Sequence, residues 1–361
     1  MSKLITFPVI GFVLGIIFFL EHSIVHSNIL SVMALISILA IIIVLAKNVA
    51  EEAEHIAENL GEPWGTIMLT LSAVAVEVII IYIMVRNGAD EYIVRDTIVY
   101  ALILDMGGIL GISVIAVALK HHSQSYNMQG MNIYLIIIIF GIILSMVLPG
   151  HIPIEHQVSY WWLTVILMII LITIFYIGSL RNYRKLFISD KSSQNTTALE
   201  SELKTHNSSG IWKHVALLIG SIVSIGVASE LMTVFLDPQI KHFGLSTSLA
   251  ALIVAMISAS PELITAIRSS MRNKTMPMVN IALGASMATL LFTVLIMKAF
   301  MLLHFIPEMS LVLNDIQMIL LFTLCSILIV AFSDKKSNSI EGIVVLLIIV
   351  VLVYFVITGI L

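Results

Sequence analysis

The chain has 361 residues, of which 59% are hydrophobic and only 11% are charged. Soluble domains carry about 25% charged residues, so this composition excludes a water-soluble fold and points to a lipid bilayer. The formal net charge of −4 argues against a nucleic-acid partner, and the single cysteine, Cys325, excludes an intrachain disulfide.

Long apolar runs are the main structural signal. A membrane-spanning helix needs roughly 17–25 mostly apolar residues, and continuous runs favour helices over a β-barrel. Eleven segments are predicted, at residues 4–20, 31–46, 64–85, 97–119, 131–148, 160–180, 215–236, 246–267, 277–300, 316–332 and 340–361. No small-residue cleavage site follows the first segment, so we interpret it as a retained helix rather than a signal peptide. The predicted fold class is an all-α integral membrane protein with about eleven transmembrane helices.

Basic residues are distributed unevenly between the loops on the two sides of the predicted membrane. Fourteen lysines and arginines fall on the side of the N-terminus, whereas three fall on the other side. Cytoplasmic loops carry the excess of such residues. The sequence therefore predicts a multi-pass protein of the cell membrane, with a cytoplasmic N-terminus and an external C-terminus.

The predicted helices divide into a first helix and two halves. Residues 1–30 hold a peripheral helix, and residues 31–180 and 213–361 hold five helices each. An odd number of helices per half places the halves in opposite orientations, which is the inverted-repeat plan of many transporters. The polar stretch 181–212 is expected to be a cytoplasmic linker, either a plain spacer or a regulatory segment.

Two glutamates fall inside predicted helices, one in each half. Glu77 lies thirteen residues after Trp64 and nine before Arg86, while Glu262 follows Pro261. At 1.5 Å per residue, Glu77 is near mid-membrane, where an ionisable group costs at least about 2.5–3.5 kcal/mol. Such a glutamate is either functional or neutralised within the bundle, and a pair in equivalent positions favours function.

These two glutamates suit a site that cations and protons share. Ca²⁺ takes 6–8 oxygen ligands, and the carboxylates of Glu77 and Glu262 would neutralise its charge. Protons compete for the same oxygens, so one alternating-access site is sufficient for antiport. Pro261 is expected to break or kink its helix and to free carbonyl oxygens beside Glu262.

Six further residues are weaker candidates for the site. They are Ser72, Asp105, Glu230, Ser258, Ser260 and Asn280. The serines offer hydroxyl oxygens, and Asp105 is either a third ligand or a structural hydrogen-bonding residue. Asn280 is either a ligand or a helix-packing residue, and Glu230 either lines an access route or is a solvated carboxylate.

The favoured function is secondary active antiport of cytoplasmic Ca²⁺ against external H⁺. No P-loop, nucleophile elbow or HExxH motif is present, so neither an enzyme nor a cofactor is expected. The alternatives are Na⁺/H⁺ or K⁺/H⁺ antiport and a cation channel. A channel would favour a symmetric oligomeric pore, and the internal duplication of this chain argues against that arrangement. A membrane protein with only a scaffolding role is a further alternative, but such a role would not require a pair of mid-membrane glutamates.

Short motifs accompany the two glutamates. In the first half they are ENLGEPWGT at 58–66, RDT at 95–97 and YNMQG at 126–130, and in the second half they are SPEL at 260–263 and NIALGAS at 280–286. Between about residues 50 and 293, the chain resembles the bacterial Ca²⁺/H⁺ antiporters of the calcium/cation antiporter superfamily. The resemblance implies two inverted five-helix repeats, with Glu77 and Glu262 as the shared cation and proton sites.

The fourth predicted helix departs from the family pattern. Where members often have an Asn-Gly pair, this chain has Gly107-Gly108, with Asp105 two residues earlier. Members of this branch are also associated with Na⁺ or K⁺ exchange, so the resemblance leaves the monovalent cations as alternatives to Ca²⁺.

Overall fold

The computed structural model describes most of the chain. The described residues are 3–25, 27–60, 64–121, 124–125, 128–181, 211–272, 275–333, 336–337 and 339–361. Nearly all of the predicted linker, residues 182–210, lies outside them, as do motif residues 61–63 and 126–127.

A first helix and five helical segments make up the part of the chain before the linker. They are α1 (Lys3–Val25), α2 (Asn28–Leu60), α3 (Trp64–Arg86), the segment α4 (Ile93–Ile103) with the π-helix η1 (Leu104–Ile109) and α5 (Leu110–His121), the segment α6 (Met128–Ile142) with the π-helix η2 (Ile143–Val147), and α7 (Gln157–Arg181). Two short 3₁₀ turns, η3 (Leu148–His151) and η4 (Ile154–His156), connect the last two segments.

Five helical segments also follow the linker. They are α10 (Ile211–Phe243), α11 (Ser248–Met271), the segment α12 (Thr275–Ala288) with the π-helix η5 (Thr289–Thr293) and α13 (Val294–Leu302), α14 (Asp315–Ala331), and α15 (Ser339–Thr358). Two loops are joined by the antiparallel pair β1 (Gln124–Ser125) and β2 (Lys336–Ser337).

The described residues thus form eleven helical segments, and the predicted all-α membrane fold is confirmed. Eight of them contain a stretch long and apolar enough to cross a bilayer. Shorter apolar helices run through α1, at Ile10–Leu20, and through α14. The eleven segments account for the hydrophobic composition, because each one presents apolar side chains to its neighbours or to lipid.

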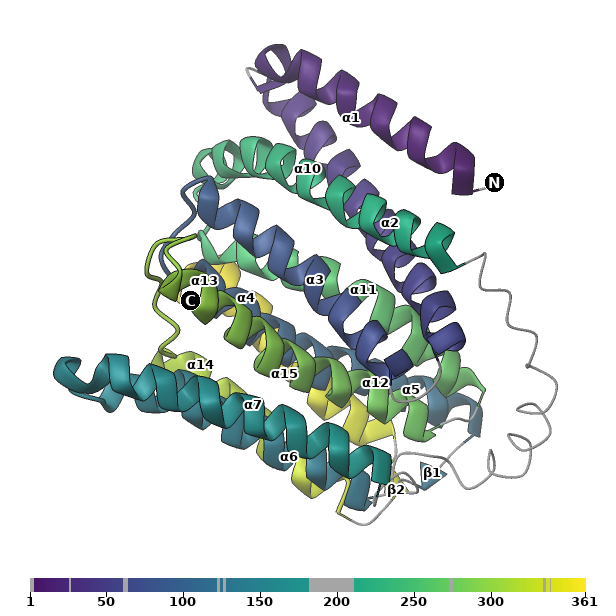
Figure 1. The fold of residues 1–361 in the computed structure, drawn as a ribbon, viewed down its shortest axis with the longest axis vertical. Coiled ribbons are helices and arrows are strands. Elements are labelled where there is room, and N and C mark those ends of the chain that lie inside the picture. The colour runs from purple at the N-terminus through teal and green to yellow at the C-terminus, as the bar shows by residue number, and fades with distance from the viewer. Residues whose placement is uncertain are drawn as a thin grey trace.

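The long helices lie side by side, with α1 at one side of the bundle and α6 and α7 at the other (Figure 1). In the second half, α10 packs along α2 and α11 packs along α4, whereas α15 packs along α5. The last contact is close because Gly111 and Gly342 face each other, and a Cβ on Gly342 would lie 2.9 Å from the Gly111 carbonyl oxygen.

The two halves share architectural features. Each begins with a 33-residue helix, α2 or α10, and in each the third segment contains a π-helix, η1 or η5. The corresponding helices run in opposite directions. We call the end of the bundle where α4, α11 and α14 begin the Asp96 end, and the opposite end, where α2 ends and α10 begins, the His214 end.

The expectation that Pro261 breaks its helix is wrong. Pro261 does not break its helix, because α11 is a continuous α-helix from Ser248 to Met271 with Pro261 inside it. Proline has no N–H for the carbonyl four residues earlier, which belongs to Ile257. The Ser260 hydroxyl donates a hydrogen bond to that oxygen at 2.7 Å. The Ile257 carbonyl is therefore satisfied within the helix rather than freed for a ligand.

Candidate functional site

Glu77 is held inside the bundle by residues of the opposite half. It lies thirteen residues into α3, and only 1% of its surface is exposed. Its Oε2 accepts hydrogen bonds from the hydroxyls of Thr289 and Thr293, each at 3.0 Å. Both threonines belong to η5. The carboxylate of one half is thus oriented by hydroxyls of the other.

The second oxygen of Glu77 has a different environment. Oε1 is buried, and no hydrogen-bond donor contacts it in the described part of the chain. Burying a polar atom without a partner is costly, and burying a charge without one costs far more. The Glu77 carboxyl therefore suits the exchange of a proton for a cation, since either one neutralises its charge.

Glu262 occupies the corresponding place in the second half. It lies fourteen residues into α11, and its residue as a whole is half-buried. Its Oε2 is nevertheless buried and receives no hydrogen bond from the described residues. The charge of Glu77 acts on the Glu262 carboxyl, so the structure brings the two predicted glutamates within electrostatic reach of each other.

Asp105 lies near both glutamates. It is in η1 and only 3% exposed, and the charges of Glu262 and Glu77 both act on its carboxyl. The π-helix makes α4 and α5 one continuous segment with a locally wider turn, a feature that is frequent at functional sites. The described residues form no group of three or more His, Cys, Asp or Glu side chains arranged to hold a metal ion.

Two of the three predicted serines donate hydrogen bonds within their own helices. The Ser72 hydroxyl donates to the Met68 carbonyl at 2.7 Å, as Ser260 does to Ile257. Such bonds to the preceding turn are common for hydroxyls inside helices. Ser258 is half-buried on α11. In this structure, Ser72 and Ser260 thus bond to their own helices rather than to the glutamates.

The remaining two candidates differ in exposure. Asn280 is half-buried in α12, whereas Glu230 is exposed on α10. Exposure distinguishes the Glu230 side chain from Glu77 and Asp105, which are both buried.

Thr289 and Thr293 are the site residues that sequence reasoning missed. They stand in the apolar run ATLLFTVLI, where threonines usually bond to the preceding turn. The available signal was their spacing of four residues, which places two hydroxyls on one face of a helix. Only the packing of η5 against α3 reveals the carboxylate that this face meets.

Comparison with known sequences identifies the family. The sequence model described as sodium/calcium exchanger protein matches the chain twice, at residues 30–179 and at residues 213–358. The chain belongs to this family. The exchanger is therefore a multi-pass membrane transporter of cations, and one match falls in each half of its sequence. The resemblance inferred from the motifs is confirmed.

Individual relatives agree with the family assignment. The exchanger is 25% identical over 319 residues to the sodium-potassium/proton antiporter ChaA of Escherichia coli K12, covering 87% of this chain and 84% of ChaA. It is 23% identical over 322 residues to the Ca²⁺/H⁺ antiporter of Aphanothece halophytica, covering 82% of this chain and 83% of that one. The structure of native YfkE matches with a TM-score of 0.69 at 20% identity, covering 92% of this chain and 97% of YfkE. At that identity, the structural match shows a shared fold.

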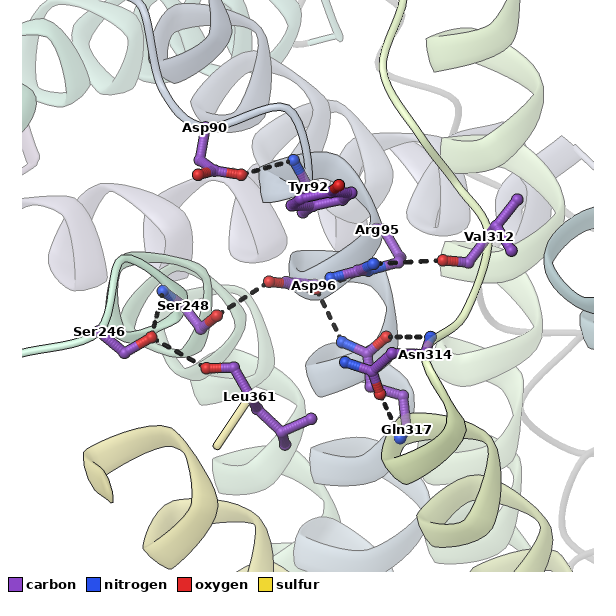
Figure 2. A network of polar contacts seen from close by, with 10 residues as sticks. All are labelled: Asp90, Tyr92, Arg95, Asp96, Ser246, Ser248, Val312, Asn314, Gln317 and Leu361. Atoms are coloured by element: carbon purple, nitrogen blue, oxygen red, sulfur yellow. Dashed lines mark hydrogen bonds and ion pairs between the residues drawn. The ribbon is translucent and has the colours of Figure 1, made fainter. Parts of the chain in front are cut away.

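A second polar cluster of the exchanger ties the halves together at the Asp96 end (Figure 2). Asp96 is 4% exposed, and Arg95 forms an ion pair with its Oδ1 at 2.7 Å. The same carboxylate accepts hydrogen bonds from Gln317 at 2.7 Å and from Ser248 at 3.0 Å. Asp96 belongs to α4, whereas Ser248 begins α11 and Gln317 lies in α14. One carboxylate thus joins three helices.

The beginning of α14 explains how Gln317 reaches Asp96. Asn314 and Gln317 form a reciprocal capping box, in which the side chain of each accepts a hydrogen bond from the backbone N–H of the other. This arrangement satisfies two groups at the helix start. It also fixes the Gln317 amide so that its Nε2 points to Asp96 (Figure 2).

A third polar contact joins α2 and α10 at the His214 end. Nδ1 of His214 lies 2.6 Å from Oε2 of Glu52, and Glu52 is 2% exposed. The rings of His55 and His214 are 4.8 Å apart. Polar contacts between the halves are therefore present at both ends of the bundle as well as at Glu77.

Proposed function

We propose that this exchanger is a secondary active antiporter that moves cytoplasmic Ca²⁺ out of the cell in return for external H⁺. Glu77 and Glu262 are its shared cation and proton sites, and alternating access exposes them to one side of the membrane at a time. In this proposal the His214 end and the N-terminus are cytoplasmic, as the distribution of basic residues predicts, and the C-terminus is external.

The observation that carries this proposal is the environment of Glu77. The residue is 1% exposed, one carboxyl oxygen is held by two threonines, and the other receives no hydrogen bond from the described residues. Ion-binding carboxyls of transporters likewise lie in the protein interior, at the interface between the repeats. A glutamate with a purely structural role would be expected to use both oxygens in hydrogen bonds.

Competition between protons and cations at one site is sufficient for coupling. A proton neutralises a buried carboxylate, and so does a bound cation, whereas the bare charge is disfavoured. Ca²⁺ suits a pair of carboxylates in its charge and in its preference for oxygen ligands. Glu77 and Glu262 thus carry either the cation or protons each time the site changes sides.

Exchange of Na⁺ or K⁺ for H⁺ is the second candidate. The similarity to a sodium-potassium/proton antiporter favours it. The roles of Glu77 and Glu262 are the same in this alternative, and only the cation differs.

Cation movement in proteoliposomes under an imposed pH gradient tests the proposal. Purified protein would be reconstituted, and Ca²⁺, Na⁺ and K⁺ would be assayed separately. Accumulation of Ca²⁺ on the acidic side, with release when the gradient is collapsed, is the expected result. Movement of only Na⁺ or K⁺ would select the second candidate, and a gradient that drives none of the three would overturn antiport.

A further inference from the structure

The two threonines that contact Glu77 depart from the usual behaviour of hydroxyls in these helices. The hydroxyls of Ser145, Ser229, Ser270 and Ser286 are all buried, and each donates to the carbonyl four residues earlier. Thr289 and Thr293 instead donate to a carboxylate on another helix. Their bonds are therefore specific to Glu77 and are not required by the helix that contains them.

We propose that Thr293 is a positioning residue that, together with Thr289, holds Glu77 in its cation-binding conformation and so determines the affinity for the transported cation. This inference rests on the proposed antiport function. It concerns a hydroxyl on the opposite half of the molecule, which acts on the cation through Glu77.

The geometry separates the two oxygens of Glu77 into different roles. Both hydroxyls bind Oε2, and Oε1 is left without a donor among the described residues. Two donors on one oxygen fix the rotation of the carboxylate, so that Oε1 is the oxygen presented to an ion. Glu77 therefore binds the cation through one oxygen while the other is anchored.

The hydroxyls also favour the form of Glu77 that binds cations. A hydrogen bond donated to an ionised carboxylate stabilises the charged form relative to the protonated form. Thr293 is fully buried, so water does not replace its hydroxyl readily. Without that hydroxyl, the proton competes better with the cation at a fixed pH, and the apparent affinity for the cation falls.

Glu262 provides a contrast inside the same site. Each glutamate has one buried oxygen that receives no hydrogen bond from the described residues. The two glutamates differ in that two hydroxyls of the opposite half hold the other oxygen of Glu77. Substitution of the threonines is expected to act through Glu77.

The test compares Thr293→Val, Thr293→Ser and Thr164→Val in proteoliposomes. Initial rates would be measured against the concentration of the cation that the wild type transports, at fixed internal and external pH. Valine keeps the shape of threonine without the hydroxyl, and serine restores the hydroxyl. Thr164 is the matched control, because it is also buried but donates only to the Tyr160 carbonyl of its own helix.

We expect Thr293→Val to raise KM for the cation about tenfold, which corresponds to about 1.4 kcal/mol, with kcat within about twofold of the wild type. Thr293→Ser is expected to restore KM, and Thr164→Val to leave it unchanged. A KM for Thr293→Val within twofold of wild type would overturn the inference, and so would an altered KM in Thr293→Ser equal to that of the valine variant.

A second variant covers the case in which Thr293→Val fails to insert. Thr289→Val removes the other hydroxyl from the same Glu77 oxygen, so the same rise in KM is expected, and an unchanged KM there overturns the inference. Failure of the antiport proposal looks different, because the wild type would then show no cation movement driven by a pH gradient.

Discussion

Ser248, the first residue of α11, donates a hydrogen bond of 3.0 Å to the carboxylate of Asp96 in α4. The bond connects the two halves at the start of the helix that carries Glu262. Asp96 is at the same time the only carboxylate paired with Arg95 among the described residues. The stability of this end of the bundle therefore depends on one acidic side chain.

Replacement of Asp96 by asparagine is expected to destabilise the protein by about 3–5 kcal/mol, because Arg95 becomes a buried charge without its partner. Thermal unfolding in detergent measures this change. The double variant Arg95→Gln/Asp96→Asn removes the uncompensated charge as well and is expected to recover part of the loss. Additive destabilisation in the double variant would contradict this account of the pair.

Glu77→Gln and Glu262→Gln are each expected to abolish exchange and to leave the protein folded and inserted. The amide cannot exchange a proton for a cation, yet it occupies nearly the same volume. Cation flux in proteoliposomes and the elution profile of the detergent-purified protein measure the two properties. Glu155→Gln, at an exposed acidic residue of η4, is the control. Full activity in either site variant would rule out that residue as an exchange site.

Ser260→Ala is expected to lower stability by about 1–3 kcal/mol, the cost of leaving a buried acceptor unsatisfied. The Ile257 carbonyl would lose the hydroxyl that compensates for Pro261. The double variant Ser260→Ala/Pro261→Ala supplies a backbone N–H in place of the hydroxyl, so its melting temperature is expected to rise again. No recovery in the double variant would show that Ser260 acts in another way.

Gly342→Ala is expected to weaken the contact between α5 and α15, at a cost of about 1–3 kcal/mol for overpacking. The added Cβ would lie 2.9 Å from both the Gly111 carbonyl oxygen and the Ile115 side chain. At Gly226, a Cβ meets the Ile79 side chain only at 3.7 Å, so Gly226→Ala serves as the tolerated control. Equal melting temperatures for the two variants would contradict the close approach.

The number and type of helices could be predicted from the sequence, because each segment contains an apolar run of spanning length. The residues at which the helices end were harder to predict from the sequence. The predicted second segment stops at residue 46, whereas α2 continues to Leu60. Glu51, Glu52 and Glu54 lower the hydropathy of this extension, yet glutamate and alanine are good helix formers. Apolarity thus marks where the membrane ends rather than where the helix ends.

The carboxylates of the candidate site could be recognised from the sequence, since an acidic residue inside an apolar run is conspicuous. Their partners could not. Thr289 lies 212 positions from Glu77, and a hydroxyl inside a helix has no distinctive sequence signal. The break at Pro261 was wrongly expected for a related reason. The hydroxyl of the neighbouring Ser260 replaces the missing backbone donor, and the expectation took no account of that hydroxyl.

The hydrogen bonds from η5 to Glu77 also have an evolutionary consequence. The carboxylate comes from the first half and its two hydroxyls come from the second, so neither half contains a complete Glu77 site. A free-standing ancestor of one half could assemble such a site only by pairing with another copy inserted upside down. After fusion of the two copies, the two halves could diverge independently, and the threonines that contact Glu77 could be kept in the second half alone.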